Sequence, residues 1–158
     1  VLFRSGEPVG FPPCTAEAVL QLLRHHGVAL DGADVVVVGR SLVIGRPVSM
    51  LLQAANATVT MCHTHTRDLA AKCAAADVVV VAAGRAGTFG ARCARPGQVV
   101  VDVGINWDEG AQRLVGDVDF DAVEPIVGAI TPVPGGVGSV TTACLAKHVV
   151  EAAERTVG

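Results

Sequence analysis

The chain has 158 residues, 51% of them hydrophobic, 17% charged and 3% aromatic, with a formal net charge of -3. Without a basic stripe or an aromatic stacking platform, nucleic-acid binding is not expected. Charged residues interrupt every apolar run before it reaches the ~18 residues of a membrane span. No signal peptide opens the chain, and its five cysteines form no C-x-x-C pair. Free thiols in a reducing cytoplasm are therefore expected.

The first residues are predicted to lie outside the main domain. Residues 1–13 contain three prolines and no hydrophobic periodicity. We interpret residues 1–12 as a linker or as the remnant of a truncated N-terminal catalytic domain, because the chain starts at Val1 rather than at a methionine. A helix over residues 16–26 follows, with Thr15 as its N-cap and Gly27 as its C-cap.

From residue 34 onward, short β-branched runs alternate with helical segments. Such runs are typical of parallel strands that are buried on both faces. The predicted strands cover residues 34–39, 57–62, 77–83 and 99–103, with less clear short strands around 114–116 and 126–129. The predicted helices cover residues 47–55 with Pro47 first, 66–76 with Thr66 as N-cap, a short segment within 84–98, and 140–155 with Thr141 or Thr142 as N-cap. This alternation predicts a single α/β domain over residues 13–158, with a Rossmann-like, doubly wound parallel sheet.

The first strand-to-helix turn is a candidate phosphate site, although it lacks the usual G-x-G-x-x-G pattern. Gly39 allows a tight exit from the strand, and Arg40 and Ser41 follow it. The helix that starts near Pro47 is expected to point free N–H groups at an anion. The alternative is an ordinary turn with two chance arginines, Arg40 and Arg46.

The end of the second strand favours NADP over NAD. NAD enzymes usually place a carboxylate there to bind the ribose hydroxyls, but residues 62–66 read Cys-His-Thr-His-Thr. Thr64 and Arg40 could instead hold a 2′-phosphate, and His63 could add a ring donor. A zinc site from His63 and His65 stays open, although no third ligand is suitably spaced.

A proline- and glycine-rich loop, Thr131-Pro-Val-Pro-Gly-Gly-Val-Gly138, precedes the last helix. Its open backbone could lie against a flat ligand ring where side chains would obstruct. The alternative is a plain turn before the helix.

Six segments in this order resemble bifunctional methylenetetrahydrofolate dehydrogenase/cyclohydrolase, the FolD family. The resemblance covers about residues 12–156, and the segments lie at 13–15, 38–47, 57–63, 103–106, 116–118 and 131–138. The sequence departs from the family at Ser139-Val140, where Pro-Met is common. The alternatives are the cofactor domain of another NAD(P)-dependent dehydrogenase and a non-catalytic nucleotide-binding module.

The resemblance implies a role for each matching residue. The residues implied to bind or border NADP are Gly39, Arg40, Ser41, Thr64, Ile105, His63, Cys14, Thr15 and Thr141. The residues implied to face the folate substrate are Pro134, Gly135, Gly136, Val137 and Gly138. The family's catalytic Tyr-x-x-x-Lys is absent, because the chain has no tyrosine and its only lysines are Lys72 and Lys147.

The resemblance therefore implies the cofactor domain of an enzyme that oxidises methylenetetrahydrofolate and hydrolyses the product. The chain alone is expected to be inactive. The helices at 16–26 and 140–155 would bridge to the missing half, and a cytoplasmic homodimer is expected.

Overall fold

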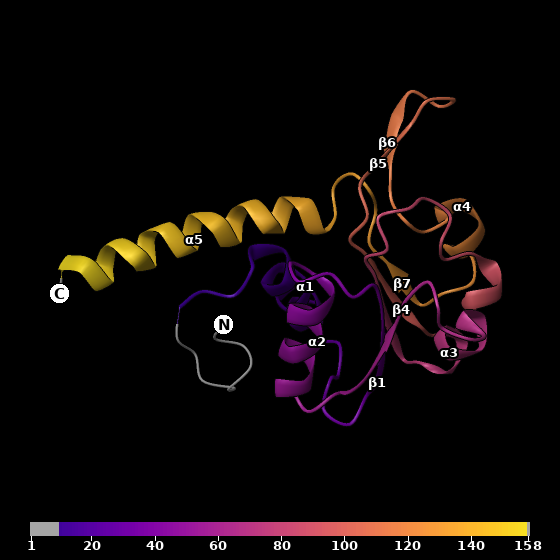
Figure 1. Ribbon diagram of the computed structural model, residues 1–158, viewed down its shortest axis with the longest axis horizontal. Helices are drawn as coiled ribbons and strands as arrows, with labels where there is room; N and C mark the ends of the chain where they lie inside the picture. The colour runs from indigo at the N-terminus through magenta and orange to yellow at the C-terminus, as the bar shows by residue number, and fades with distance from the viewer. Residues whose placement is uncertain (1–9, 158) are drawn as a thin grey trace.

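The fold is built on a five-stranded parallel sheet in the order β2-β1-β3-β4-β7 (Figure 1). It is taken from a computed structural model that describes residues 10–157. The strands are β1 (Asp34–Val38), β2 (Thr58–Cys62), β3 (Val78–Val81), β4 (Val99–Asp102) and β7 (Ala129–Ile130). Because β2 lies on one side of β1 and β3 on the other, the chain reverses its direction of winding beside β1. The predicted α/β, Rossmann-like, doubly wound sheet is confirmed.

The valine runs form central strands because both faces of the sheet are covered. Val35 and Val37 of β1 belong to one hydrophobic core, whereas Val36 and Val38 belong to a second core on the opposite face. Successive side chains of a strand point to opposite faces, so an unbroken valine run supplies both cores at once. β3 divides its four valines in the same way.

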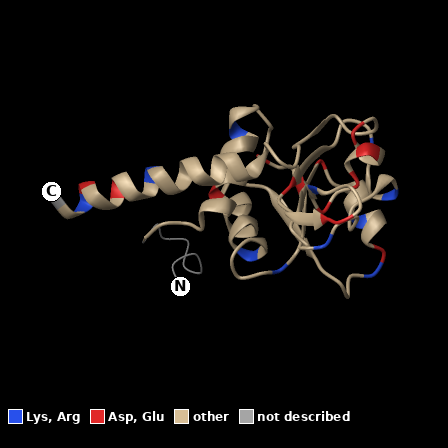
Figure 2. Ribbon diagram, turned by 90° about the horizontal axis from the view of Figure 1, so that it is seen from above, with Lys and Arg blue, Asp and Glu red and all other residues tan. Residues whose placement is uncertain are grey.

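Helices cover both faces of the sheet (Figure 1). One face carries α1 (Cys14–His25), α2 (Gly45–Ala54) and the start of α5 (Val137–Val157). The other carries α3 (Leu69–Ala75), α4 (Phe120–Val123) and a 3-10 turn (Ala91–Cys93). The outer part of α5 extends away from the sheet, and Figure 2 shows residues of both charges along it.

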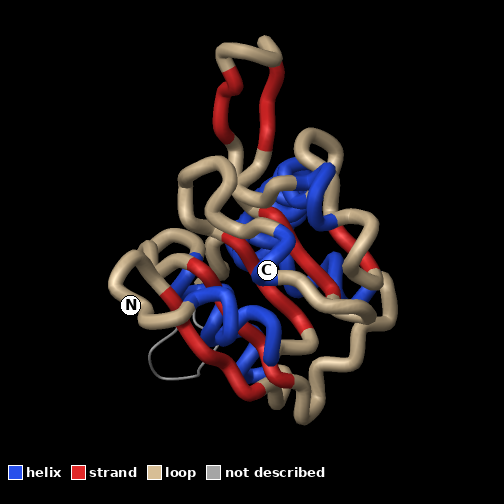
Figure 3. Tube along the Cα trace, turned by 90° about the vertical axis from the view of Figure 1, so that its right-hand side faces the viewer, coloured by secondary structure: helices blue, strands red, loops and turns tan. Residues whose placement is uncertain are grey.

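A two-stranded antiparallel hairpin stands out from the domain (Figures 1 and 3). It consists of β5 (Asn106–Asp108) and β6 (Arg113–Val115). Trp107 is 58% exposed there and Leu114 is 41% exposed. The sequence predicted a strand near 114–116 but not its partner β5 or the short helix α4.

The predicted N-caps are wrong at three helices. α1 begins at Cys14, so Thr15 lies inside its first turn and makes no capping bond. At α3 the cap is Asp68, which accepts the N–H of Ala71 at 3.2 Å, whereas Thr66 accepts the N–H of His63 at 2.8 Å. Each hydroxyl could reach several N–H groups, and tertiary packing decides which one it meets.

The last helix begins earlier than predicted. α5 starts at Val137, so Thr141 and Thr142 lie within it and donate to the carbonyls of Val137 and Gly138.

Other predicted element bounds differ by a few residues. Pro47 is the third residue of α2 rather than the first. The predicted strands are a few residues shorter in the structure, the last one is β7, and the helix within 84–98 is only the 3-10 turn.

Most of the predicted linker lies outside the described residues. Of its 12 residues, the structure describes Gly10, Phe11 and Pro12. The Phe11 ring packs against His148 of α5, with ring centroids 4.8 Å apart.

Candidate functional site

The first turn of the sheet passes close to its neighbour, and this explains two glycines. A Cβ on Gly39 would lie 2.2 Å from the carbonyl oxygen of Ala82, and a Cβ on Gly45 would lie 2.4 Å from that of Gly39. Gly39 also has a φ of 135°, a conformation that side chains disfavour. The turn therefore packs its backbone against the end of β3.

An open cleft of about 850 Å³ lies beyond the carboxyl ends of β1, β3 and β4. This is the position where ligands bind in doubly wound sheets, because the chain changes direction between β1 and β3. Its lining comes from α1, from the turns after these strands, from the hairpin and from the start of α5: Thr15, Ser41, Ile44, Ala82, Ala83, Gly84, Asp102, Val103, Gly104, Ile105, Leu114, Asp117, Pro132, Val133, Pro134, Gly135, Gly136, Val137, Gly138, Ser139, Thr141 and Thr142.

Ser41 organises the start of α2. Its Oγ accepts the N–H of Ile44 at 3.0 Å and that of Gly45 at 3.3 Å, and its carbonyl accepts the N–H of Arg46 at 3.0 Å. The expectation of free N–H groups at this helix start is therefore wrong for these three residues. What the helix still directs toward the cleft is the positive end of its dipole.

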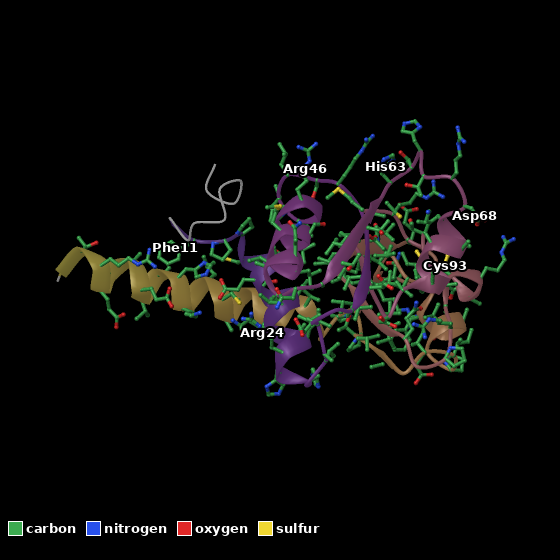
Figure 4. The ribbon with its side chains drawn as sticks, turned by 90° about the horizontal axis from the view of Figure 1, so that it is seen from below. Phe11, Arg24, Arg46, His63, Asp68 and Cys93 are labelled. Carbon is green, nitrogen blue, oxygen red and sulfur yellow. The ribbon has the colours of Figure 1, made fainter. Side chains whose placement is uncertain are left out.

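The loops after β1 and β2 lie side by side, since the N–H of Gly39 donates to the carbonyl of Cys62 at 2.8 Å. Arg40 and Thr64 follow directly, and both are exposed. Within residues 10–157, Arg40 makes no ion pair with a carboxylate. Figure 4 shows Arg46 and His63 on the same edge of the molecule.

The two histidines of this loop are linked to each other. The backbone N–H of His65 donates to Nδ1 of His63 at 3.2 Å, so the neutral His63 ring carries its proton on Nε2. Within the described part of the chain, no group of three or more His, Cys, Asp or Glu side chains is arranged to hold a metal ion.

The proline- and glycine-rich loop forms the opposite wall of the cleft. Gly136 lies so close to Pro132 that a Cβ would come within 2.4 Å of its carbonyl oxygen. Gly138, at the start of α5, has open space beside it. The wall is therefore largely backbone, as the loop composition predicted.

Two buried carboxylates in the floor of the cleft, Asp102 and Asp117, were not predicted as site residues, although Asp117 lies in the matching segment 116–118. Asp102, which ends β4, accepts the N–H groups of Gly104, Asp117 and Val118 at 2.9 to 3.0 Å. Asp117 has no exposed surface. Its Oδ2 accepts the N–H groups of Ala83 at 2.6 Å and Gly84 at 2.7 Å.

The side chain of Asn106 completes this network, donating to Oδ1 of Asp117 at 2.9 Å and to the carbonyl of Gly116 at 3.1 Å. Burial raises the pKa of Asp102 above its usual value. Three backbone hydrogen bonds lower the pKa, and the nearby Asp117 raises it, but burial is the largest effect. The two aspartates join the turns after β3 and β4 to the segment that follows the hairpin. They fix the floor of the cleft.

A cue for these aspartates is present in the sequence. Gly104 and Gly116 each lie beside one carboxylate, and a Cβ on either would come within 2.3 Å of a carboxylate oxygen. For Asp102 the cue is an aspartate at the end of an apolar strand with glycine two residues later, and for Asp117 it is the glycine directly before the aspartate.

Nine of the residues singled out from the sequence line the cleft: Thr15, Ser41, Ile105, Pro134, Gly135, Gly136, Val137, Gly138 and Thr141. Gly39, Arg40, His63 and Thr64 lie in the two adjoining loops, outside the lining. Cys14 is also outside the lining, and its Sγ lies 3.5 Å from Nδ1 of His148.

A doubly wound sheet with a cleft at its switch point defines the class of Rossmann-like, ligand-binding α/β domains. Comparison with known proteins then identifies the family. The family model described as tetrahydrofolate dehydrogenase/cyclohydrolase, NAD(P)-binding domain, matches residues 13–157. The chain belongs to this family.

Relatives agree in sequence and in fold. The bifunctional protein FolD of Carboxydothermus hydrogenoformans is 54% identical over 149 residues, covering 94% of this chain and 52% of that protein. The crystal structure of the FolD methylenetetrahydrofolate dehydrogenase/cyclohydrolase from Campylobacter jejuni matches with a TM-score of 0.93 and 42% identity, over 98% of this chain and 54% of that one.

A second similar structure is a complex with ligands. It is the Trypanosoma brucei FolD complexed with NADP cofactor and inhibitor, with a TM-score of 0.89 and 42% identity, over 99% of this chain and 55% of that one. The chain spans about half the length of the curated relatives it matches. Within the described residues, no helix is both long and apolar enough to cross a membrane.

Proposed function

We propose that residues 13–158 bind NADP as the cofactor domain of a methylenetetrahydrofolate dehydrogenase and methenyltetrahydrofolate cyclohydrolase. The observation that carries the proposal is the hydrogen bond from Gly39 to Cys62, which sets the Arg40 turn beside the carboxylate-free loop of Thr64. The trypanosomal relative, which is complexed with NADP, supports it.

In this proposal the chain's own residues bind and orient the dinucleotide. Gly39 and Ser41 form the turn that the phosphates approach, and Arg40 and Thr64 hold the 2′-phosphate, with His63 donating from Nε2. Ile105 packs beside the nicotinamide end, and Thr15 and Thr141 border the cleft, with Cys14 just outside its lining. The cofactor, when bound, supplies the hydride acceptor.

The residues Pro134, Gly135, Gly136, Val137 and Gly138 form the wall that faces the folate. Because this wall is mainly backbone, it can approach a flat pterin ring closely. By the family resemblance, the proton-handling tyrosine and lysine would lie in the part of the longer relatives that this chain does not match. No catalytic residue is assigned in this chain.

Helices α1 and α5 are proposed to bridge to that other half. Leu145, Val149 and Val150 of α5 are 54%, 62% and 57% exposed, and exposed apolar side chains of this size often pack against another domain. A homodimer is also proposed, with the exposed Trp107 and Leu114 of the hairpin as the supporting apolar surface. Five free cysteines support a reducing, cytoplasmic location.

Calorimetry with NADP and NAD tests the cofactor proposal. NADP should bind more tightly, and Arg40→Ala should weaken NADP by ~1.5–3 kcal/mol, the contribution of a hydrogen bond to a charged group. NAD should change little, and Arg24→Ala, an exposed arginine of α1, is the matched control. Equal affinities for the two cofactors, or an equal loss for both, would refute the role of Arg40.

A further inference from the structure

A cysteine, a histidine and a glutamate contact one another where α1 packs against α5. The Sγ of Cys14 lies 3.5 Å from Nδ1 of His148, and Nε2 of His148 lies 2.5 Å from Oε2 of Glu17. His148 and Glu17 are each only 7% exposed, whereas Cys14 is partly exposed. None of the three lines the cleft.

The glutamate determines which nitrogen of His148 carries the proton. Burial alone would raise the pKa of Glu17. Hydrogen bonds from His148 and Lys147, and the charges of these residues, together outweigh burial, so the net shift of the pKa is downward. An ionised carboxylate only accepts hydrogen bonds, so Nε2 of His148 donates to it. In the neutral ring, Nδ1 is therefore an acceptor that faces the Cys14 thiol.

Other groups surround this cluster and hold it in place. Lys147 lies 3.2 Å from Oε1 of Glu17 and 3.6 Å from Glu151. The Phe11 ring packs on His148, and the guanidinium of Arg155 lies 4.4 Å from the centre of that ring. Figure 4 shows Phe11 beside α5. Among the described residues, Cys144 is a further titratable group near Cys14.

We propose that Cys14 is a covalent modification site for soft alkylating electrophiles, with His148 as the proton acceptor and Glu17 as the residue that positions it. The thiol proton moves to Nδ1 of His148, and the sulfur attacks carbon. With iodoacetamide, a C–S bond forms, the C–I bond breaks and iodide leaves. The imidazolium then returns its proton to water. A nucleophile, a base and a residue that orients the base are the parts that activate cysteines generally.

Two further observations favour Cys14 over the other thiols. Cys14 is the first residue of the 12-residue helix α1, and a helix N-terminus favours a thiolate. The other four cysteines are buried. Burial raises the pKa of Cys62 and Cys144, and raises that of Cys73 to about 12.

The test is the rate of iodoacetamide alkylation at each cysteine of the full chain at pH 7, followed by peptide mass spectrometry. Cys14 should react at least about tenfold faster than any other cysteine, and about tenfold faster than the same residue in the guanidinium-unfolded chain. His148→Ala should remove most of this advantage at pH 7. The difference from wild type should shrink as the pH rises, because hydroxide can then accept the thiol proton in place of His148.

The matched control is His25→Ala, which removes an exposed histidine at the other end of α1 and should leave the rate unchanged. Circular dichroism checks that the variants fold. If His148→Ala does not fold, the comparison of folded with unfolded wild type still decides. The proposal is overturned if folded Cys14 reacts no faster than unfolded Cys14, or if His148→Ala reacts like wild type at pH 7.

Discussion

Asp117→Asn tests whether buried carboxylates hold the cleft together. Oδ2 of Asp117 accepts two backbone N–H groups, from Ala83 and Gly84, and Oδ1 accepts the side-chain amide of Asn106. The carboxylate is therefore surrounded by donors on both oxygens, and Asp117 has no exposed surface. An asparagine replaces one of these acceptors with a donor.

Neither orientation of the new amide avoids a clash between donors. With its nitrogen toward Ala83 and Gly84, two hydrogen bonds are lost. With its nitrogen toward Asn106, one bond is lost, and turning the Asn106 amide would break its bond to the Gly116 carbonyl. A hydrogen bond to a charged group contributes about 1.5–3 kcal/mol. Since the remaining bonds also lose their charged acceptor, the expected loss of stability is about 3 kcal/mol.

Urea unfolding followed by circular dichroism measures this loss in the free energy of unfolding. Asp121→Asn is the matched control, because Asp121 is exposed on α4 and should change stability by no more than about 0.5 kcal/mol. A loss below about 1 kcal/mol for Asp117→Asn would mean that the network does not stabilise the domain as argued.

Gly39→Ala should destabilise the domain by about 3 kcal/mol or more, because the new Cβ meets the Ala82 carbonyl at a strained φ. Gly27→Ala has a positive φ but nothing within 4 Å, so it should cost only about 1–2 kcal/mol; equal losses in urea unfolding would contradict the steric argument. Glu17→Gln should flatten the acid side of the stability profile. A carboxyl whose pKa is lowered by folding contributes stability above its unfolded pKa of about 4.3 and loses it as the pH falls through the folded value. Melting temperatures between about pH 3 and 7 measure this, and parallel curves for wild type and variant would count against it.

The strands could be predicted from the sequence because strands covered on both faces have a simple sequence pattern. A strand that is covered on both faces needs an apolar residue at every position, and the runs at 35–38 and 78–81 meet this demand with valine alone. The alternation of strands with helices also predicts that the strands are parallel, whereas their order in the sheet comes from the structure. The β-branched runs therefore predict both the sheet and the edge where the cleft lies.

The helix starts could not be predicted in the same way. Thr15, Thr66 and Thr141 each stand close to a helix start, yet none of them is the N-cap. A threonine hydroxyl can bond to a carbonyl one turn back, as Thr141 does, or close a loop, as Thr66 does. These choices have similar free energies, so local sequence does not separate them.

Some residues of the candidate site could be predicted from the sequence and others could not. Residues that act through their backbone or through their place in a turn, such as Gly39 and Gly136, were identified because glycine there has a steric reason that the sequence expresses. Asp102 and Asp117 were not identified as site residues. An isolated aspartate in a sequence is usually an exposed charge, and only the structure shows the N–H groups that surround these two. Their partners come from segments far apart in the chain, up to 34 residues in the case of Ala83.

The distribution of polar groups assigns different roles to the two sides of the cleft. The carboxyl groups of the floor already accept hydrogen bonds from backbone N–H groups and from Asn106, and the wall at 134–138 is mostly backbone. Neither has a free charge to discriminate between cofactors. Arg40, exposed beyond β1, does have one, because it makes no ion pair with a carboxylate within residues 10–157. Thr64, exposed beyond β2, adds a neutral hydroxyl beside it. In the proposed function, selectivity for a 2′-phosphate would therefore arise in these two loops, while the buried aspartates hold the turns that form the floor of the cleft.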